Sequence, residues 1–133
     1  MSPQDKKLFL AKEWFLRSQD DEAAIKSMFK SGDWPANVVC FLSQQMAEKI
    51  LKGFLIFHGI RFPKTHLLEE LLRVCKEVDQ SFGELEQETR YLSDFYISTR
   101  YPGDYPSFSF DDARIAFQEA SKIKDFVFKK VIA

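Results

Sequence analysis

The sequence has 133 residues, the size of one domain, and its 19 Lys and Arg residues nearly balance its 20 Asp and Glu residues. The net charge of −1 excludes binding of nucleic acids or membranes that rests on overall charge. Aromatic residues make up 15% of the chain, which supplies a full core and a further apolar face. We expect one domain over residues 1–133.

The sequence also indicates where the protein works. No apolar run approaches the roughly 20 residues that cross a bilayer, and no signal-type apolar core follows the N-terminus. We therefore expect a cytoplasmic protein without membrane contact. Cys40 and Cys75 fall within helical apolar patterns, which predicts reduced, buried thiols. The two His residues have no metal-ligand spacing, so we expect no metal and no cofactor.

The first predicted helix covers residues 3–31. Ser2 is suited to the N-cap, Pro3 to the first helical position and Asp5 to the positive end of the helix dipole. Gly32 is suited to a left-handed residue that ends the helix.

The second predicted helix covers residues 35–58, with Asp33 as its N-cap and apolar residues at a spacing of three and four. Gly53 lies inside it at a cost of about 1 kcal/mol relative to Ala, which indicates close approach of another helix. Gly59 ends this helix, and Pro63 prevents an immediate restart.

Three further helices complete the pattern. Thr65 is predicted to cap a helix over 66–79, a turn follows at 81–83, and the next helix covers 84–98. Residues 99–108 are too rich in Pro and Gly for regular structure, and Ser109 caps the last helix. No alternating strand pattern is present. The fold class is therefore all-α, an up-and-down bundle of five helices with short connections.

Three segments in this order resemble one family. They read FLSQQMAEKILKGFLIFHG at residues 41–59, FPKTHLLEELL at 62–72 and FYISTRYPGDYP at 95–106. Together they are similar to HEPN (higher eukaryotes and prokaryotes nucleotide-binding) domain proteins, and the resemblance covers nearly the whole chain. It implies a bundle like the helical domain of kanamycin nucleotidyltransferase, homodimerisation, and a separate minimal nucleotidyltransferase as partner, in some cases as a toxin–antitoxin pair.

Several HEPN branches are ribonucleases with an Arg-x4–6-His motif, in which His moves protons and Arg stabilises charge. The matching segment here offers Arg100, but residues 105–107 read Tyr-Pro-Ser and contain no His. Arg61 and His66 also form an Arg-x4-His pair, in the loop after the second predicted helix. That pair is the alternative catalytic site, and the structural interpretation is that His66 only helps to start the next helix.

The TRYPGDYP segment is a candidate ligand-binding loop. Arg100 can contact a phosphate or carboxylate through two nitrogens, and Tyr101 and Tyr105 can stack on a base or a protein partner. Asp104 can pair with Arg100 or cap a turn. The structural alternative is a rigid corner that covers one end of the bundle.

Polar residues also follow one another along the second predicted helix. They are Gln44, Gln45, Glu48, Lys49 and Lys52. Such a strip is either a solvated face or the lining of a groove or dimer contact. A basic patch for nucleotide phosphate is a related prediction, formed by Lys49, Lys52, Arg61 and Lys64.

These observations give three hypotheses about function. The first is a non-catalytic, homodimeric HEPN binding module that works with a minimal nucleotidyltransferase and has nucleotide as a candidate ligand. The second is a toxin-like, metal-independent ribonuclease that cleaves RNA through Arg100 or the pair of Arg61 and His66. The third is a structural protein without a small ligand.

Overall fold

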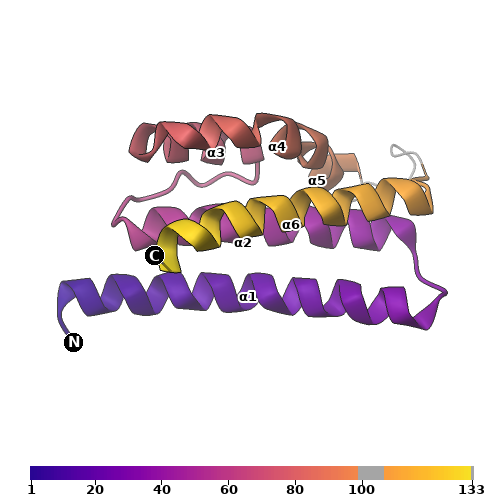
Figure 1. Cartoon of the computed structure of the whole chain (residues 1–133), viewed down its shortest axis with the longest axis horizontal. Helices are drawn as coiled ribbons and strands as arrows, with labels where there is room; N and C mark the ends of the chain where they lie inside the picture. The colour runs from indigo at the N-terminus through magenta and orange to yellow at the C-terminus, as the bar shows by residue number, and fades with distance from the viewer. Residues whose placement is uncertain (99–106, 133) are drawn as a thin grey trace.

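The computed structural model describes residues 1–98 and 107–132, and these contain helices and no strand (Figure 1). The elements are α1 (Pro3–Ser31), α2 (Ala36–Phe57), α3 (Leu68–Val78), the 3₁₀ helix η1 (Gln80–Leu85), α4 (Glu86–Ser93), α5 (Phe95–Ser98) and α6 (Phe110–Ile132). The all-α class predicted from the sequence is confirmed. No helix among these residues is long and apolar enough to cross a membrane.

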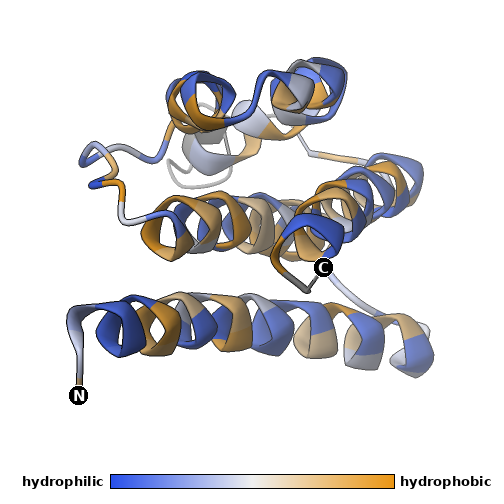
Figure 2. Cartoon of the chain, turned by 60° about the vertical axis from the view of Figure 1, so that its left-hand side comes forward, coloured by the Kyte–Doolittle hydropathy of each residue, from blue (hydrophilic) through white to orange (hydrophobic). Residues whose placement is uncertain are grey.

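The helices lie in three layers around α2. Figure 1 shows α1 as one outer layer, α2 and α6 in the middle, and α3 with α4 on the opposite side. The central helix α2 contacts α1, α6 and α3. Its ribbon is largely hydrophobic in Figure 2, whereas hydrophilic and hydrophobic segments alternate along α1. This difference is expected, because only a helix covered on several sides gains from apolar residues around most of its circumference.

The predicted ends of α1 and the start of α6 are confirmed. The Ser2 hydroxyl accepts a hydrogen bond from the Asp5 amide, and the Asp5 carboxylate accepts one from the Ser2 amide. Gly32 has a φ of 79°, the left-handed conformation expected of a terminating glycine. Ser109 and Asp112 exchange the same pair of bonds at the start of α6.

Two predicted caps are wrong. The N-cap of α2 is Pro35 rather than Asp33, and no side chain caps this helix. A proline disfavours the helical conformation in the residue before it, so Trp34 cannot join the helix and Asp33 lies too early to reach its first amides. At α3 the N-cap is Leu67, and the Thr65 hydroxyl accepts a bond from the Leu67 amide just before the helix.

The helix predicted over 84–98 is divided into η1, α4 and α5. It also begins earlier than predicted, because the Asp79 carboxylate accepts hydrogen bonds from the amide and hydroxyl of Ser81. The predicted turn at 81–83 is therefore part of a 3₁₀ helix, in which Phe82 is fully buried.

The connection over residues 58–67 returns along α2 before α3 begins (Figure 1). The Gln44 amide donates to the carbonyl oxygen of His66, and the Cys75 thiol contacts the carbonyl oxygen of Leu51 at 3.9 Å. Both α2 and α3 therefore advance in the same direction, and the connection places His66 beside the middle of α2.

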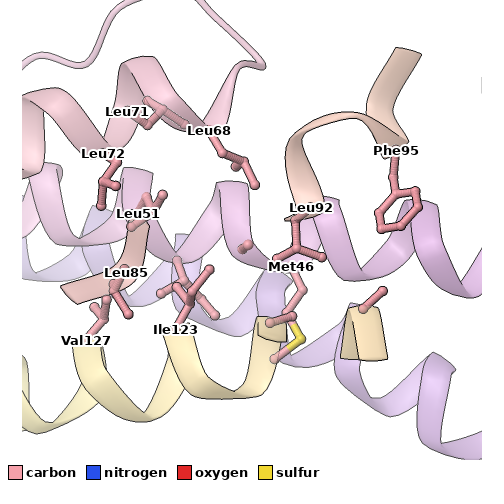
Figure 3. Packing of buried hydrophobic residues seen from close by; sticks show 14 of the residues in the cluster. Met46, Leu51, Leu68, Leu71, Leu72, Leu85, Leu92, Phe95, Ile123 and Val127 are labelled. Carbon is pink, nitrogen blue, oxygen red and sulfur yellow. The ribbon is translucent and has the colours of Figure 1, made fainter. Parts of the chain in front are cut away.

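The core lies between α2, α3, α4 and α6. Figure 3 shows Leu51 of α2 beside Leu72 of α3, and Met46 of α2 beside Leu92 and directed toward α6, which adds Ile123 and Val127 to the same cluster. Cys40 and Cys75 are free and buried, as predicted, and burial raises the pKa of each thiol to about 12. Both cysteines therefore act as small apolar residues.

Candidate functional site

A row of polar side chains on α2 faces the interior of the protein. Gln44, Glu48 and Lys52 lie four residues apart, so they share one side of the helix, and all three are buried. The Lys52 ammonium lies 2.9 Å from the Glu48 carboxylate, and it lies 5.5 Å from the ring centroid of Trp14 and 5.1 Å from that of Phe62. A buried charged pair is tolerated when each charged group keeps hydrogen-bond partners, and within this row Gln44 and Lys52 both donate to Glu48.

The side chain of His66 completes the polar row from the other side. Its Nδ1 lies 3.1 and 3.2 Å from the two Glu48 carboxylate oxygens. A carboxylate beside an ammonium is ionised and can only accept, so Nδ1 carries the proton and donates it. The His66 side chain is 53% exposed, whereas that of Glu48 is 6% exposed. A buried carboxylate thus fixes the orientation of an imidazole that is itself about half exposed.

Two aromatic rings extend this cluster. The imidazole of His66 stacks on Tyr96 of α5 with 4.4 Å between ring centroids and 14° between ring planes. Tyr96 also stacks with Phe41 of α2, at 6.2 Å and 28°. We call the group formed by Gln44, Glu48, Lys52, His66 and Tyr96 the His66 cluster. It joins α2, the 58–67 connection and α5.

The remaining predicted basic residues lie in different surroundings. The Lys49 ammonium lies 2.8 Å from the Asp21 carboxylate of α1, and burial raises the pKa of Asp21 despite this contact. Lys49 therefore joins α1 to α2. Arg61 and Lys64 are exposed in the 58–67 connection, and neither forms an ion pair with a described residue.

The structure brings only part of the predicted site together. His66 contacts Glu48 rather than Arg61, its partner in the alternative catalytic pair. The predicted ligand-binding residues of the TRYPGDYP segment, which are Arg100, Tyr101, Asp104 and Tyr105, lie outside the described residues. Within residues 1–98 and 107–132, no three His, Cys, Asp or Glu side chains gather as a metal site would require.

A second feature of the surface is an apolar groove between α1 and the end of α6. Its volume is about 250 Å³, and it is lined by Lys12, Phe15, Leu16, Gln19, Phe128 and Val131. Leu16 is 54% exposed and Phe9, two turns earlier on α1, is 52% exposed. Exposed apolar groups that gather in this way are typical of surfaces that contact another protein.

The sequence interpretation assigned no individual functional role to Glu48, Phe41 or Tyr96. The signal for Glu48 was available, because Gln44, Glu48 and Lys52 recur every four residues on a helix that is mostly apolar. The partnership of Glu48 with His66 had no such signal, since it depends on the path of the 58–67 connection.

Comparisons with known proteins agree with this architecture. A crystal structure of TT1696 from Thermus thermophilus has 28% sequence identity and a TM-score of 0.79, covering 90% of this chain and 97% of that one. The crystal structure of ST0689, an archaeal HEPN homologue, has 26% identity and a TM-score of 0.73, covering 91% of this chain and 97% of that one.

Sequence comparison gives the same result. The Methanocaldococcus jannaschii protein named "Putative toxin MJ1304" is 27% identical over an alignment of 139 positions, which covers 90% of this chain and 90% of that protein. The profile of the HEPN domain matches residues 11–131, nearly the whole sequence. With its all-helical fold, this chain therefore belongs to the HEPN domain family.

Proposed function

We propose that this protein is a non-catalytic HEPN binding module, which forms a homodimer and works with a separate minimal nucleotidyltransferase. Nucleotide is the candidate small ligand. The observation that carries the proposal is the outward apolar face of α1. Phe9 and Leu16 are each about half exposed on this helix, and Leu16 continues into the groove beside α6.

The outer face of α1 is well defined by the helix geometry. Ala11, Ser18 and Ile25 are buried against the rest of the protein and follow one another every seven residues. Phe9 and Leu16 precede Ala11 and Ser18 by two positions, which places them about 200° away around the helix. They therefore point away from the core, and about half of each side chain is exposed.

A second copy of this chain fits that face. In an antiparallel, two-fold arrangement of two α1 helices, Phe9 of each copy can lie against Leu16 of the other. The same register brings Lys6 of each copy close to Asp20 of the other, so opposite charges flank the apolar contact at both ends. Lys6 and Asp20 are both exposed.

Light scattering during gel filtration tests the homodimer, and co-expression with a minimal nucleotidyltransferase tests the partner. We expect twice the mass of 15.6 kDa and co-purification of the two proteins. A monomer at every concentration that does not retain the nucleotidyltransferase would contradict the proposal.

A toxin-like, metal-independent ribonuclease is the second candidate, supported by the contact between Glu48 and His66. An imidazole that donates through Nδ1 to a carboxylate can accept a proton at Nε2, as a general base must. The similar protein named "Putative toxin MJ1304" points the same way. Cellular RNA incubated with the protein in EDTA tests this function: cleavage lost in His66→Ala and kept in His58→Ala would support it, and intact RNA would exclude it.

A further inference from the structure

One face of the His66 ring is available to a ligand. Tyr96 covers the opposite face by stacking, and Glu48 occupies the Nδ1 edge. The side chain is nevertheless 53% exposed. The exposed area must therefore belong to the uncovered ring face and to the edge that carries Nε2.

This ring is held in place before any ligand binds. The Glu48 carboxylate accepts from Nδ1, and the Gln44 amide donates to the backbone carbonyl of His66 at 3.1 Å. Glu48 and Gln44 are themselves buried, so neither support moves freely. An aromatic surface that is already immobile loses little entropy when a flat ligand stacks on it.

We propose that the uncovered face of His66 is a stacking surface for the base of a nucleotide, whose phosphate is bound by Arg61 and Lys64. The proposal rests on the proposed function as a binding module and deepens it by naming the ligand and its position. Stacking on an aromatic ring tolerates any base, because every base has a flat π face. A guanidinium suits phosphate through paired N–H groups, and an ammonium suits it as a compact charge.

The location of the cations supports a phosphate rather than a second apolar ligand. Arg61 and Lys64 precede His66 by five and two residues in the same connection, and both are exposed. Neither has a carboxylate partner among the described residues, whereas Lys49 and Lys52 are both paired. Since the net charge of the chain is −1, a single nucleotide fits this small basic surface better than a long nucleic acid.

NMR titrations with AMP and with ribose 5-phosphate test this site. The two probes share the sugar and phosphate, and only AMP carries a base. We expect wild type to bind AMP more tightly. His66→Ala should weaken AMP binding about tenfold or more and leave ribose 5-phosphate binding unchanged. His66→Phe should bind AMP more tightly than His66→Ala, because it keeps a flat ring although it cannot donate to Glu48.

Two further variants complete the experiment. His58→Ala removes the other histidine, which is exposed and contacts Phe54 at a tilt and Phe57 edge to face, and it should change neither affinity. The double variant Arg61→Met with Lys64→Met should weaken the binding of AMP and of ribose 5-phosphate by the same factor. Equal affinity of wild type for the two probes, or AMP binding by His66→Phe that is no tighter than by His66→Ala, would overturn the proposal. The dimer mass and the co-purification would still test the proposed function separately.

Discussion

At the scale of single residues, the most unusual feature is the buried carboxylate of Glu48. It accepts hydrogen bonds from Gln44 and Lys52 of α2 and from His66 of the 58–67 connection. A carboxylate has about four acceptor positions, so three donors satisfy most of them without water. This is why a charged residue can lie in the middle of a mostly apolar helix. Among the three partners, removal of Lys52 should lower the stability of the protein most.

Lys52→Met should therefore lower the free energy of unfolding by roughly 3 kcal/mol, because it leaves a buried carboxylate without its counter-ion. Met retains the packing against Trp14 and Phe62, so the loss of unfolding free energy measures the effect of removing the charge. Urea unfolding measures the change. Arg73→Met, which removes an exposed ion pair with Glu77, should cost about 1 kcal/mol or less.

The double variant Glu48→Gln with Lys52→Met removes both charges and should recover part of the lost stability. If Lys52→Met cost no more than Arg73→Met, the buried pair would have no special importance.

At the scale of elements, α1 packs closely on α2 at Gly53. A Cβ atom at this position would lie 2.5 Å from Cε1 of Phe15, which is closer than non-bonded carbons can approach. The close approach predicted from a glycine inside a helix is confirmed, and the neighbour is the aromatic ring of Phe15 on α1.

Gly53→Ala tests that packing. The added methyl group should cost about 1–3 kcal/mol by overpacking, against a gain of about 1 kcal/mol in helix propensity. We expect a net loss in the urea unfolding free energy. Gly83→Ala is the matched control, because its added Cβ meets nothing closer than 3.9 Å and its φ is not positive. That variant should be neutral or more stable by about 0.4–1 kcal/mol, and equal losses in the two variants would contradict the packing explanation.

Asp79 joins the start of η1 to the end of α6. Its carboxylate lies 2.8 Å from the Lys130 ammonium and also accepts from Ser81. Lys130 and then Ser81 lower the pKa of Asp79 from 3.8 to about 2. A carboxyl with a lowered pKa stabilises the folded state above its unfolded pKa, and this contribution is lost as the pH falls through the folded pKa.

Asp79→Asn should therefore be less stable than wild type above pH 4, and the difference should shrink as the pH falls from about 4 to about 2. Asn can still accept from Ser81, so the difference reports the charge on Asp79. Urea midpoints measured from pH 2 to pH 6 check this. A difference that stays constant over the whole range would show that the ion pair with Lys130 contributes nothing.

At the scale of the whole molecule, α1 is a layer covered on one side only. Figure 1 shows it at the edge of the bundle, with α2 on its inner side. Its half-exposed Phe9 and Leu16 are better explained by a contact between two molecules than by the packing of one.

Phe9→Glu with Leu16→Glu should convert the proposed homodimer into a monomer, because four carboxylates would meet across the two-fold contact. Light scattering would show half the wild-type mass, and the thermal unfolding of the isolated chain should change little because both side chains point outward. Val38→Glu with Ile115→Glu is the control, since it adds the same charge at exposed apolar positions on α2 and α6. A dimer that survives the α1 change but not the control change would place the interface elsewhere.

The sequence by itself determined the helical segments of this protein and several of their ends. Ser2, Gly32 and Ser109 act within a few residues of their own positions, so their roles can be predicted without knowledge of the fold. Asp33 and Thr65 failed as predicted caps because the neighbouring Pro35 and the path before α3 shifted the helix starts.

Only the tertiary structure decided which polar residues meet. The four-residue spacing of Gln44, Glu48 and Lys52 indicates a shared face of α2, but spacing cannot show what covers that face. The connection after α2 turns back along the helix and so brings His66 to Glu48 and onto Tyr96. Hydrophobic periodicity identifies the side of a helix that is buried, whereas the partner on that side depends on the course of the whole chain.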